Sequence, residues 1–219
     1  MMQKIFEPIF SVVYLILVFY WSYWMYKRSQ PKTLGRTYAD MAFFLGFGDA
    51  FHLIPRILAL NSDTPLDYTV MLGFGKLVTS ITMTVFYIYF YLTLRNEKLC
   101  CESKPIDRLV WVLAITRFLL ILLPQNGWIT ENPSLLFGVL RNVPFVMLGI
   151  LIMGILFLHY RSSNDKTSGL QALLVFLSYL FYIPVVLFAS SVSWVGLLMI
   201  PKTVCYLVLV YTMKKEFTK

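Results

Sequence analysis

Residues 135–159 read LLFGVLRNVPFVMLGILIMGILFLH, and this run decides the fold class of the chain. Arg141 is the only residue in it that carries a full charge at neutral pH. An α-helix rises about 1.5 Å per residue, so about 20 apolar residues are enough to cross roughly 30 Å of hydrocarbon. The run therefore predicts a transmembrane helix.

Similar apolar runs recur along the whole chain. The 219 residues are 58% apolar and the mean hydropathy is +0.71, both above ordinary globular usage. We predict an all-α fold, a polytopic transmembrane bundle of seven helices in a single integral membrane domain over residues 1–219. A turn near Ser190, Ser191 and Ser193 divides the last two spans, because one continuous helix there would be about 66 Å long. The predicted spans are residues 5–26, 37–60, 68–94, 107–124, 135–159, 170–190 and 194–213.

The loops between these spans predict an orientation. Cytoplasmic loops are enriched in Lys and Arg. Thirteen of the basic residues fall in the segments 27–36, 95–108 and 160–169 and in the C-terminal tail, whereas the alternate segments carry only Lys4. We therefore expect the N-terminus to lie outside the cytoplasm and the C-terminus inside it.

The five remaining basic residues fall inside predicted spans. A central Arg or Lys costs about 2.5–3.5 kcal/mol on insertion scales, so we expect these side chains to face the bundle interior or a wet cavity. Counted from the outer end of each helix, all five lie in the outer half of the membrane. They are Arg56, Lys76, Arg117, Arg141 and Lys202.

Several uncharged or acidic polar groups fall in the same layer. Asp49, His52 and Arg56 are spaced i, i+3 and i+7, which places them on one face of the second span. Asn142 follows Arg141 in the fifth span, and Tyr182 lies in the sixth.

The charges in this layer do not balance, since five cations face only two acids, Glu7 and Asp49. A pocket that opens to the outside and admits an anion would resolve the excess. Phosphate, carboxylate or the headgroup of an anionic lipid fits, and the protein would then be a sensor or a transporter. The predicted ligand-binding residues are Asp49, His52, Arg56, Lys76, Arg117, Arg141, Asn142, Tyr182 and Lys202.

Other interpretations of the same residues stay open. Asp49 and Lys76 would also suit a purely structural ion pair, and Arg56 is near enough to its helix end to reach the interface. A membrane-embedded enzyme acting on a lipid headgroup could use Asp49 and His52 as an acid–base pair. A purely structural or assembly role is a third class.

Two similar pentapeptides predict a helix contact. LGFGD at 45–49 and LGFGK at 72–76 place small residues where two helices can approach closely. We expect the second and third spans to be packed neighbours.

Two resemblances to known families add expectations. Lys202 resembles the retinal-bearing lysine of rhodopsins, which implies a retinal-type chromophore; because the third and seventh spans lack a carboxylate, Asp49 or Glu7 would be the counterion. The segment GFGDAFHLIPR at 46–56, with residues 75–84, resembles uncharacterised small multispanning membrane proteins of low-GC Gram-positive bacteria. That likeness implies a bacterial plasma membrane and nothing about chemistry.

Several other classes are not expected. His52 and His159 are far apart and near opposite membrane faces, so we predict no metal site and no cofactor. The basic residues lie in loops between apolar spans, which does not match a nucleic-acid-binding surface. Cys100, Cys101 and Cys205 imply no disulfide framework. The expected partners are membrane lipids and a cytoplasmic protein bound through segments 95–108 or 160–169.

Overall fold

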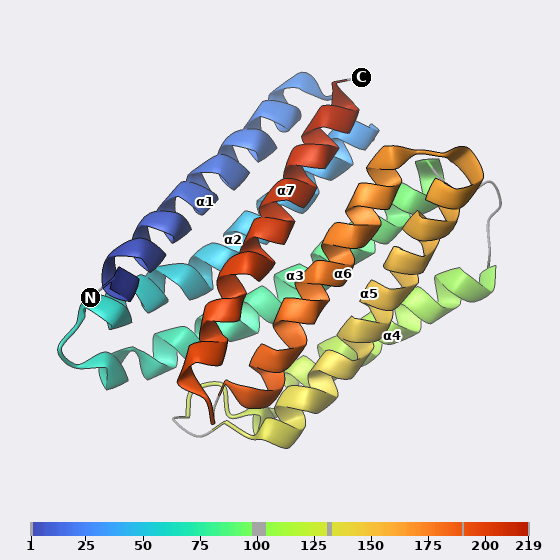
Figure 1. Cartoon of the computed structure of the whole chain (residues 1–219). Helices are drawn as coiled ribbons and strands as arrows, with labels where there is room; N and C mark the ends of the chain where they lie inside the picture. Colours follow the sequence, from blue (N-terminus) through green and yellow to red (C-terminus); the bar gives the residue numbers. More distant parts are fainter. Residues whose placement is uncertain (1, 98–103, 131–132, 190, 219) are drawn as a thin grey trace. The chain divides into compact units, whose positions relative to one another are not determined.

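A computed structural model describes residues 2–97, 104–130, 133–189 and 191–218. The pair Cys100–Cys101 and two of the expected cytoplasmic basic residues, Lys98 and Lys219, lie outside these ranges. Within them the regular structure is helical, without strands (Figure 1). The α-helices are α1 Met2–Arg28, α2 Leu34–Asn61, α3 Thr69–Glu97, α4 Lys104–Leu122, α5 Leu135–Ser163, α6 Lys166–Phe188 and α7 Met199–Phe217. The short 3₁₀ segments are η1 Pro65–Tyr68, η2 Pro124–Asn126 and η3 Ser193–Leu198.

Each predicted span coincides with one of these α-helices, which confirms the all-α fold of seven helices. The expected break near Ser191 lies between α6, which ends at Phe188, and α7, which begins at Met199. The seventh helix begins five residues later than predicted because residues 193–198 form η3. Pro201 consequently lies in the first turn of α7, where its missing N–H leaves no intrahelical bond unmade.

Within the described ranges, six helices are long and apolar enough to cross a membrane, and the chain is a multi-pass membrane protein. They comprise α1, α2, α3, α5, α6 and α7. The remaining helix, α4, has 19 residues, but it carries Lys104, Asp107 and Arg108 in its first turns and Arg117 further along. Charge, and not length, sets it apart from the others.

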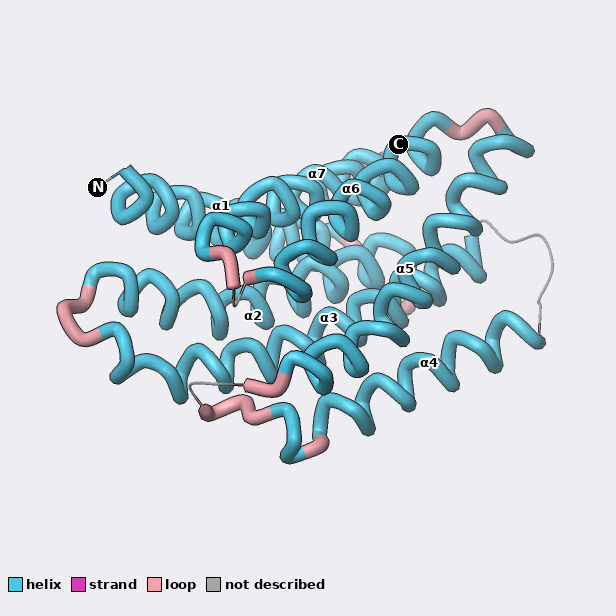
Figure 2. Tube along the Cα trace, turned by 60° about the horizontal axis from the view of Figure 1, so that its bottom comes forward, coloured by secondary structure: helices cyan, strands magenta, loops and turns pink. Residues whose placement is uncertain are grey.

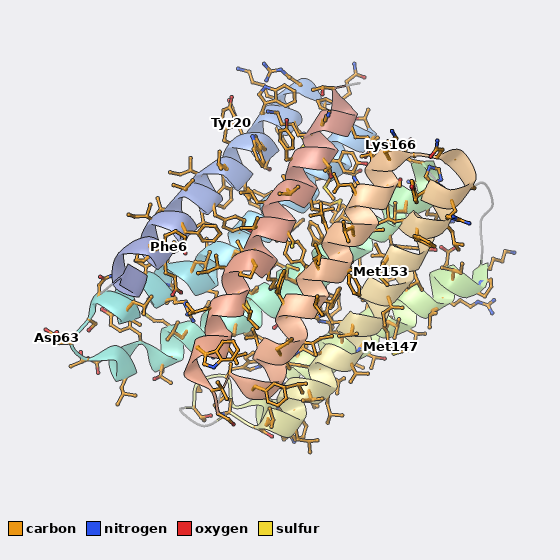
Figure 3. All side chains as sticks on the ribbon, viewed as in Figure 1. Phe6, Tyr20, Asp63, Met147, Met153 and Lys166 are labelled. Atoms are coloured by element: carbon orange, nitrogen blue, oxygen red, sulfur yellow. The ribbon has the colours of Figure 1, made fainter. Side chains whose placement is uncertain are left out.

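The two faces of α4 nevertheless match a membrane helix. From Leu109 onward, exposed apolar side chains recur along it at intervals of three or four residues, and Arg117 lies on the opposite, buried face. Helix α1 has a comparable outward stripe from Phe6 to Tyr20 (Figure 3). A soluble monomer rarely exposes such large apolar surfaces, whereas acyl chains cover them readily. The exposed apolar residues of α4 include Leu109, Val112, Ile115, Leu119 and Leu122.

The chain divides into two compact units, and each is described by itself. The first comprises residues 1–86 and 121–134, and the second residues 87–120 and 135–219. Figure 2 shows that the loops joining consecutive helices are short where they are described.

In the first unit, α2 packs closely on both α1 and α3. Ser22 of α1 donates a hydrogen bond from Oγ to the Ala39 carbonyl oxygen at 2.8 Å. Thr79 Oγ1 of α3 donates to the Gly48 carbonyl oxygen at 2.7 Å, and a Cβ added at Gly75 would lie 2.1 Å from the Phe51 carbonyl oxygen. Backbones meet here without an intervening side chain. The predicted contact between the second and third helices is confirmed.

In the second unit, α6 packs against both α5 and α7. Gly149 of α5 accommodates the ring of Tyr179, since an added Cβ would lie 2.0 Å from its Cε2 atom. The last turns of α3 are tied to the first turn of α4, where Asp107 Oδ1 accepts from the Tyr91 hydroxyl at 2.6 Å and lies 3.4 Å from Arg95 Nε.

The glycine contact between α2 and α3 yields a matched test. Gly75→Ala should lower the free energy of unfolding by about 1–3 kcal/mol, because the new methyl group meets backbone that cannot move aside. Gly154→Ala is the control: a Cβ there meets no atom within 4 Å, so better helix propensity should raise stability by up to about 1 kcal/mol. Thermal melting of the detergent-purified variants measures both. Equal melting temperatures for the two variants would contradict this packing.

Membrane crossing by α4 can be tested with single cysteines at the exposed positions Asp63, Thr130 and Ser163 in a cysteine-free background. If all seven helices cross, an impermeant maleimide labels Asp63→Cys and Thr130→Cys from one side of the membrane and Ser163→Cys from the other. Should α4 remain on one side, Asp63→Cys and Ser163→Cys would be labelled together instead.

Candidate functional site

The polar groups of the first unit are largely satisfied by one another. Glu7 of α1 is buried and its carboxylate forms an ion pair with Arg56 Nε of α2. Two turns of α1 further on, the Tyr14 hydroxyl donates a hydrogen bond to Asp49 Oδ2 at 2.6 Å. Arg56, one of the five intramembrane cations, therefore already has an anionic partner within the chain.

The other predicted site residues of this unit differ in exposure. His52 lies on α2 between Asp49 and Arg56 and is half-buried. Lys76 is exposed. The structure places these two residues in the first unit and Arg117, Arg141, Asn142, Tyr182 and Lys202 in the second.

In the second unit, Arg117 of α4 is a buried cation with an unusual set of partners. Its side chain is 2% exposed, and its Cζ atom lies 3.5 Å from the centroid of the Phe145 ring of α5. Among the residues that the structure describes, neither its Nε nor its Nη1 has a hydrogen-bond partner. The aromatic face offsets the guanidinium charge only in part, and no carboxylate among the described residues forms an ion pair with it.

A second buried cation, Lys202 of α7, lies over aromatic rings of the same unit. Its Nζ atom is 4.7 Å from the Tyr182 ring centroid and 5.5 Å from that of Tyr206, and the residue is 7% exposed. Cation–π contacts of this kind contribute about 0.5–2 kcal/mol.

Asn142 holds Tyr182 in place. The Asn142 Oδ1 atom accepts from the Tyr182 hydroxyl at 2.9 Å, and its Nδ2 donates to the Gly138 carbonyl oxygen at 2.8 Å. Both ends of this amide are occupied, so Asn142 acts as a positioning residue. Arg141, the preceding residue on α5, is half-buried.

Phe145 lies at the centre of the aromatic side chains. Its ring meets those of Tyr87, Tyr179 and Tyr182 at centroid distances of 5.0, 5.2 and 6.0 Å. The Tyr179 hydroxyl donates to the Phe145 carbonyl oxygen at 2.8 Å. The residues that contact this ring, together with those that contact Tyr87 or Tyr182 in turn, are called the Arg117 cluster: Tyr87, Arg117, Asn142, Phe145, Tyr179, Tyr182, Lys202 and Tyr206.

Half of this cluster was not predicted from the sequence: Tyr87, Phe145, Tyr179 and Tyr206. For Tyr206 a signal existed, because it lies four residues after Lys202 and so shares its helix face. Tyr179 is likewise three residues before Tyr182. Tyr87 lies in the aromatic-rich segment FYIYFY at 86–91, where nothing in the sequence distinguishes it.

Two described acids of the second unit, Asp107 and Asp165, have partners at other positions along the chain. Asp107 lies ten residues before Arg117 on α4, which is about 15 Å along the axis, and it contacts Tyr91 and Arg95. Asp165 caps α6 by accepting from the backbone N–H groups of Thr167 and Ser168. The carboxylates are thus separated lengthwise from the cations.

This arrangement offers N–H donors without an internal acceptor. A buried donor that lacks a partner costs about 1–3 kcal/mol, so such groups usually mark an ion, a water molecule or a ligand. The guanidinium fork matches the oxygens of a phosphate or carboxylate. No group of three or more His, Cys, Asp or Glu side chains within the described ranges is arranged to hold a metal ion.

No protein family, curated protein or solved structure matches the chain. The likeness of residues 46–56 and 75–84 to small bacterial membrane proteins stays a prediction, as does the retinal-type interpretation of Lys202. The geometry of the two units is therefore the basis for the functional proposal.

The ion pair of the first unit predicts unequal effects of its two deletions. Arg56→Gln leaves a carboxylate that is 7% exposed, whereas Glu7→Gln leaves a cation that is 31% exposed and closer to water. We expect Arg56→Gln to cost about 3–5 kcal/mol of stability and Glu7→Gln about 1–3 kcal/mol. Thermal melting in detergent measures the difference.

The double variant supplies the control, because it removes both charges together. It should be more stable than Arg56→Gln alone, since no carboxylate is left buried without a cation. Strictly additive losses would show that the two side chains do not interact.

Proposed function

We propose that the protein binds an anionic group, a phosphate or a carboxylate, at the Arg117 cluster of its second unit, as a membrane sensor or transporter. The headgroup of an anionic lipid carries the same chemistry. One observation supports this most directly: Arg117 is buried, and its Nε and Nη1 have no hydrogen-bond partner in the described part of the chain.

The chemistry of the cluster fits an oxyanion. As far as the structure describes the chain, Arg117 has N–H groups without partners on Nε and on Nη1, which point in different directions within the guanidinium plane, so each can donate to an oxygen of a phosphate or carboxylate. Lys202 adds a compact second charge, and the rings of Tyr182 and Tyr206 beneath it fix its position. Because burial removes competing water, each of these contacts is stronger here than it would be at an exposed surface.

The orientation in our proposal follows from the basic loops. With the N-terminus outside a plasma membrane, Arg117 lies five residues, about 8 Å, from the outer end of α4, and Lys202 lies three residues, about 5 Å, from the outer end of α7. An anion would then enter from outside. The described connections between helices are short, so a response would pass through the helices themselves or through a cytoplasmic protein.

Replacing the buried charge tests the proposal. Arg117→Met removes the cation but keeps an apolar side chain against Phe145. The variant should be more stable than the wild type without ligand, by about 1–2 kcal/mol, because burying an uncompensated charge costs more than its cation–π contact returns. An anion at 100 times its Kd should raise the free energy of unfolding of the wild-type protein by about 2.7 kcal/mol, which raises its melting temperature by roughly 5–10 °C. The same anion should leave the melting temperature of Arg117→Met unchanged.

A matched control removes the same charge from the same helix. Arg108 is exposed near the start of α4, and Arg108→Gln should keep the full response. The probes are inorganic phosphate, acetate, phosphatidylglycerol and, as a zwitterionic comparison, phosphatidylcholine. A melting temperature of wild-type protein that none of the anions moves, or an Arg117→Met variant that responds normally, would rule out this site.

A further inference from the structure

An open groove of about 610 Å³ runs along the α5–α6 pair in the second unit. The size is within the range of about 300–1,000 Å³ that is usual for small-molecule sites. Met153 and Phe157 form one wall on α5, and Leu173 and Phe176 form the other on α6. Tyr160 and Lys166 also line the groove, and they contribute a hydroxyl group and an ammonium group to it.

The groove is hollow because its floor is built from small residues. A Cβ added at Gly154 would meet no atom within 4 Å, so open space lies directly above this backbone. Nearer the turn, Gly169 of α6 lies against the ring of Tyr160, whose Cδ2 would be 3.0 Å from an added Cβ. The helices therefore meet at the turn and leave a channel beside Gly154.

The length of the groove corresponds to one membrane leaflet. Lys166 is at the first residue of α6 and Phe176 is ten residues further along, which is about 15 Å. The hydrocarbon core is about 30 Å thick, so the groove extends from the interface to about the bilayer midplane. Figure 3 shows Lys166 at the turn and Met153 well along α5 from it.

The charges at the turn favour an anion. Lys166 and Arg161 are both exposed there. The neighbouring acid, Asp165, accepts from the N–H groups of Thr167 and Ser168 and from the Ser168 hydroxyl, so its carboxylate is directed at the start of α6. An apolar channel one leaflet deep with a cation at its mouth is complementary to an anionic amphiphile.

We propose that the α5–α6 groove is a binding site for an anionic phospholipid, with one acyl chain along Gly154 and the phosphate at Lys166. This site is separate from the Arg117 cluster. Along α5, Gly154 is 12 residues from Asn142, about 18 Å, and along α6 Lys166 is 16 residues from Tyr182, about 24 Å.

Native mass spectrometry of the full chain in detergent tests the site with dioleoyl phosphatidylglycerol, dioleoyl phosphatidylcholine and glycerol 3-phosphate. Wild-type protein should retain phosphatidylglycerol about fivefold more strongly than phosphatidylcholine, as expected for one surface lysine. Glycerol 3-phosphate, which has the charge but no chain, should not displace it. Gly154→Leu fills the channel, so this variant should bind one phosphatidylglycerol fewer. Lys166→Gln should still bind a phospholipid but should no longer prefer phosphatidylglycerol to phosphatidylcholine.

Two controls separate this site from other sources of lipid binding. A Cβ at Gly196 in η3 also meets no atom within 4 Å, so Gly196→Leu adds the same bulk outside the groove and should retain the lipid. Arg117→Met should retain it as well, so failure of the anion site and failure of the groove are distinguishable. If Gly154→Leu folds poorly, Leu173→Trp fills the channel from α6 and is judged in the same way.

Three results would overturn the proposal. The first is undiminished phosphatidylglycerol binding in folded Gly154→Leu or Leu173→Trp. The second is equal retention of the two phospholipids by wild-type protein. The third is complete displacement by glycerol 3-phosphate, which would assign the binding to the phosphate alone.

Discussion

The scarcity of water in the hydrocarbon core is the constraint on which this structure depends. Water cannot hydrate a charge there, so each ionised side chain needs a partner from the protein, a lipid or a ligand. Arg56 meets this requirement with a buried carboxylate, Glu7. Arg117 meets it only in part, through the face of Phe145. Because Arg56 has a carboxylate partner, we interpret it as half of a structural ion pair. Because Arg117 has only an aromatic one among the described residues, we interpret it as part of a candidate binding site.

The same constraint explains the construction of α4. Its charged residues set it apart from the six more apolar helices, yet the charges are confined to its first turns and to one buried position. The exposed stripe from Leu109 to Leu122 leaves an apolar surface toward the surroundings. A helix can therefore carry an intramembrane cation if that cation is directed at aromatic partners, which offset part of its cost.

The sequence predicted the helices well and the site only in part, for a physical reason. Helix number follows from the length of apolar runs, and the α2–α3 contact from glycines that permit close approach. Which cation meets which partner depends on the rotation of each helix about its axis, which composition does not determine. Glu7 and Arg56 were assigned to one layer, but their pairing was not predicted. With 14 Tyr and 18 Phe in the chain, no single aromatic residue stood out as the partner of Arg117.

The hydroxyl groups of Tyr87 and Tyr206 lie 3.1 Å apart, and either one can be the donor. Reversing the direction of this bond requires the hydroxyl protons to turn, with no change of rotamer and no movement of a helix. Tyr87 also interacts with Tyr179 and Ser178, so a reversal would change the direction of the neighbouring hydrogen bonds as well. The aromatic wall next to Lys202 can thus change its polarity within an otherwise rigid scaffold.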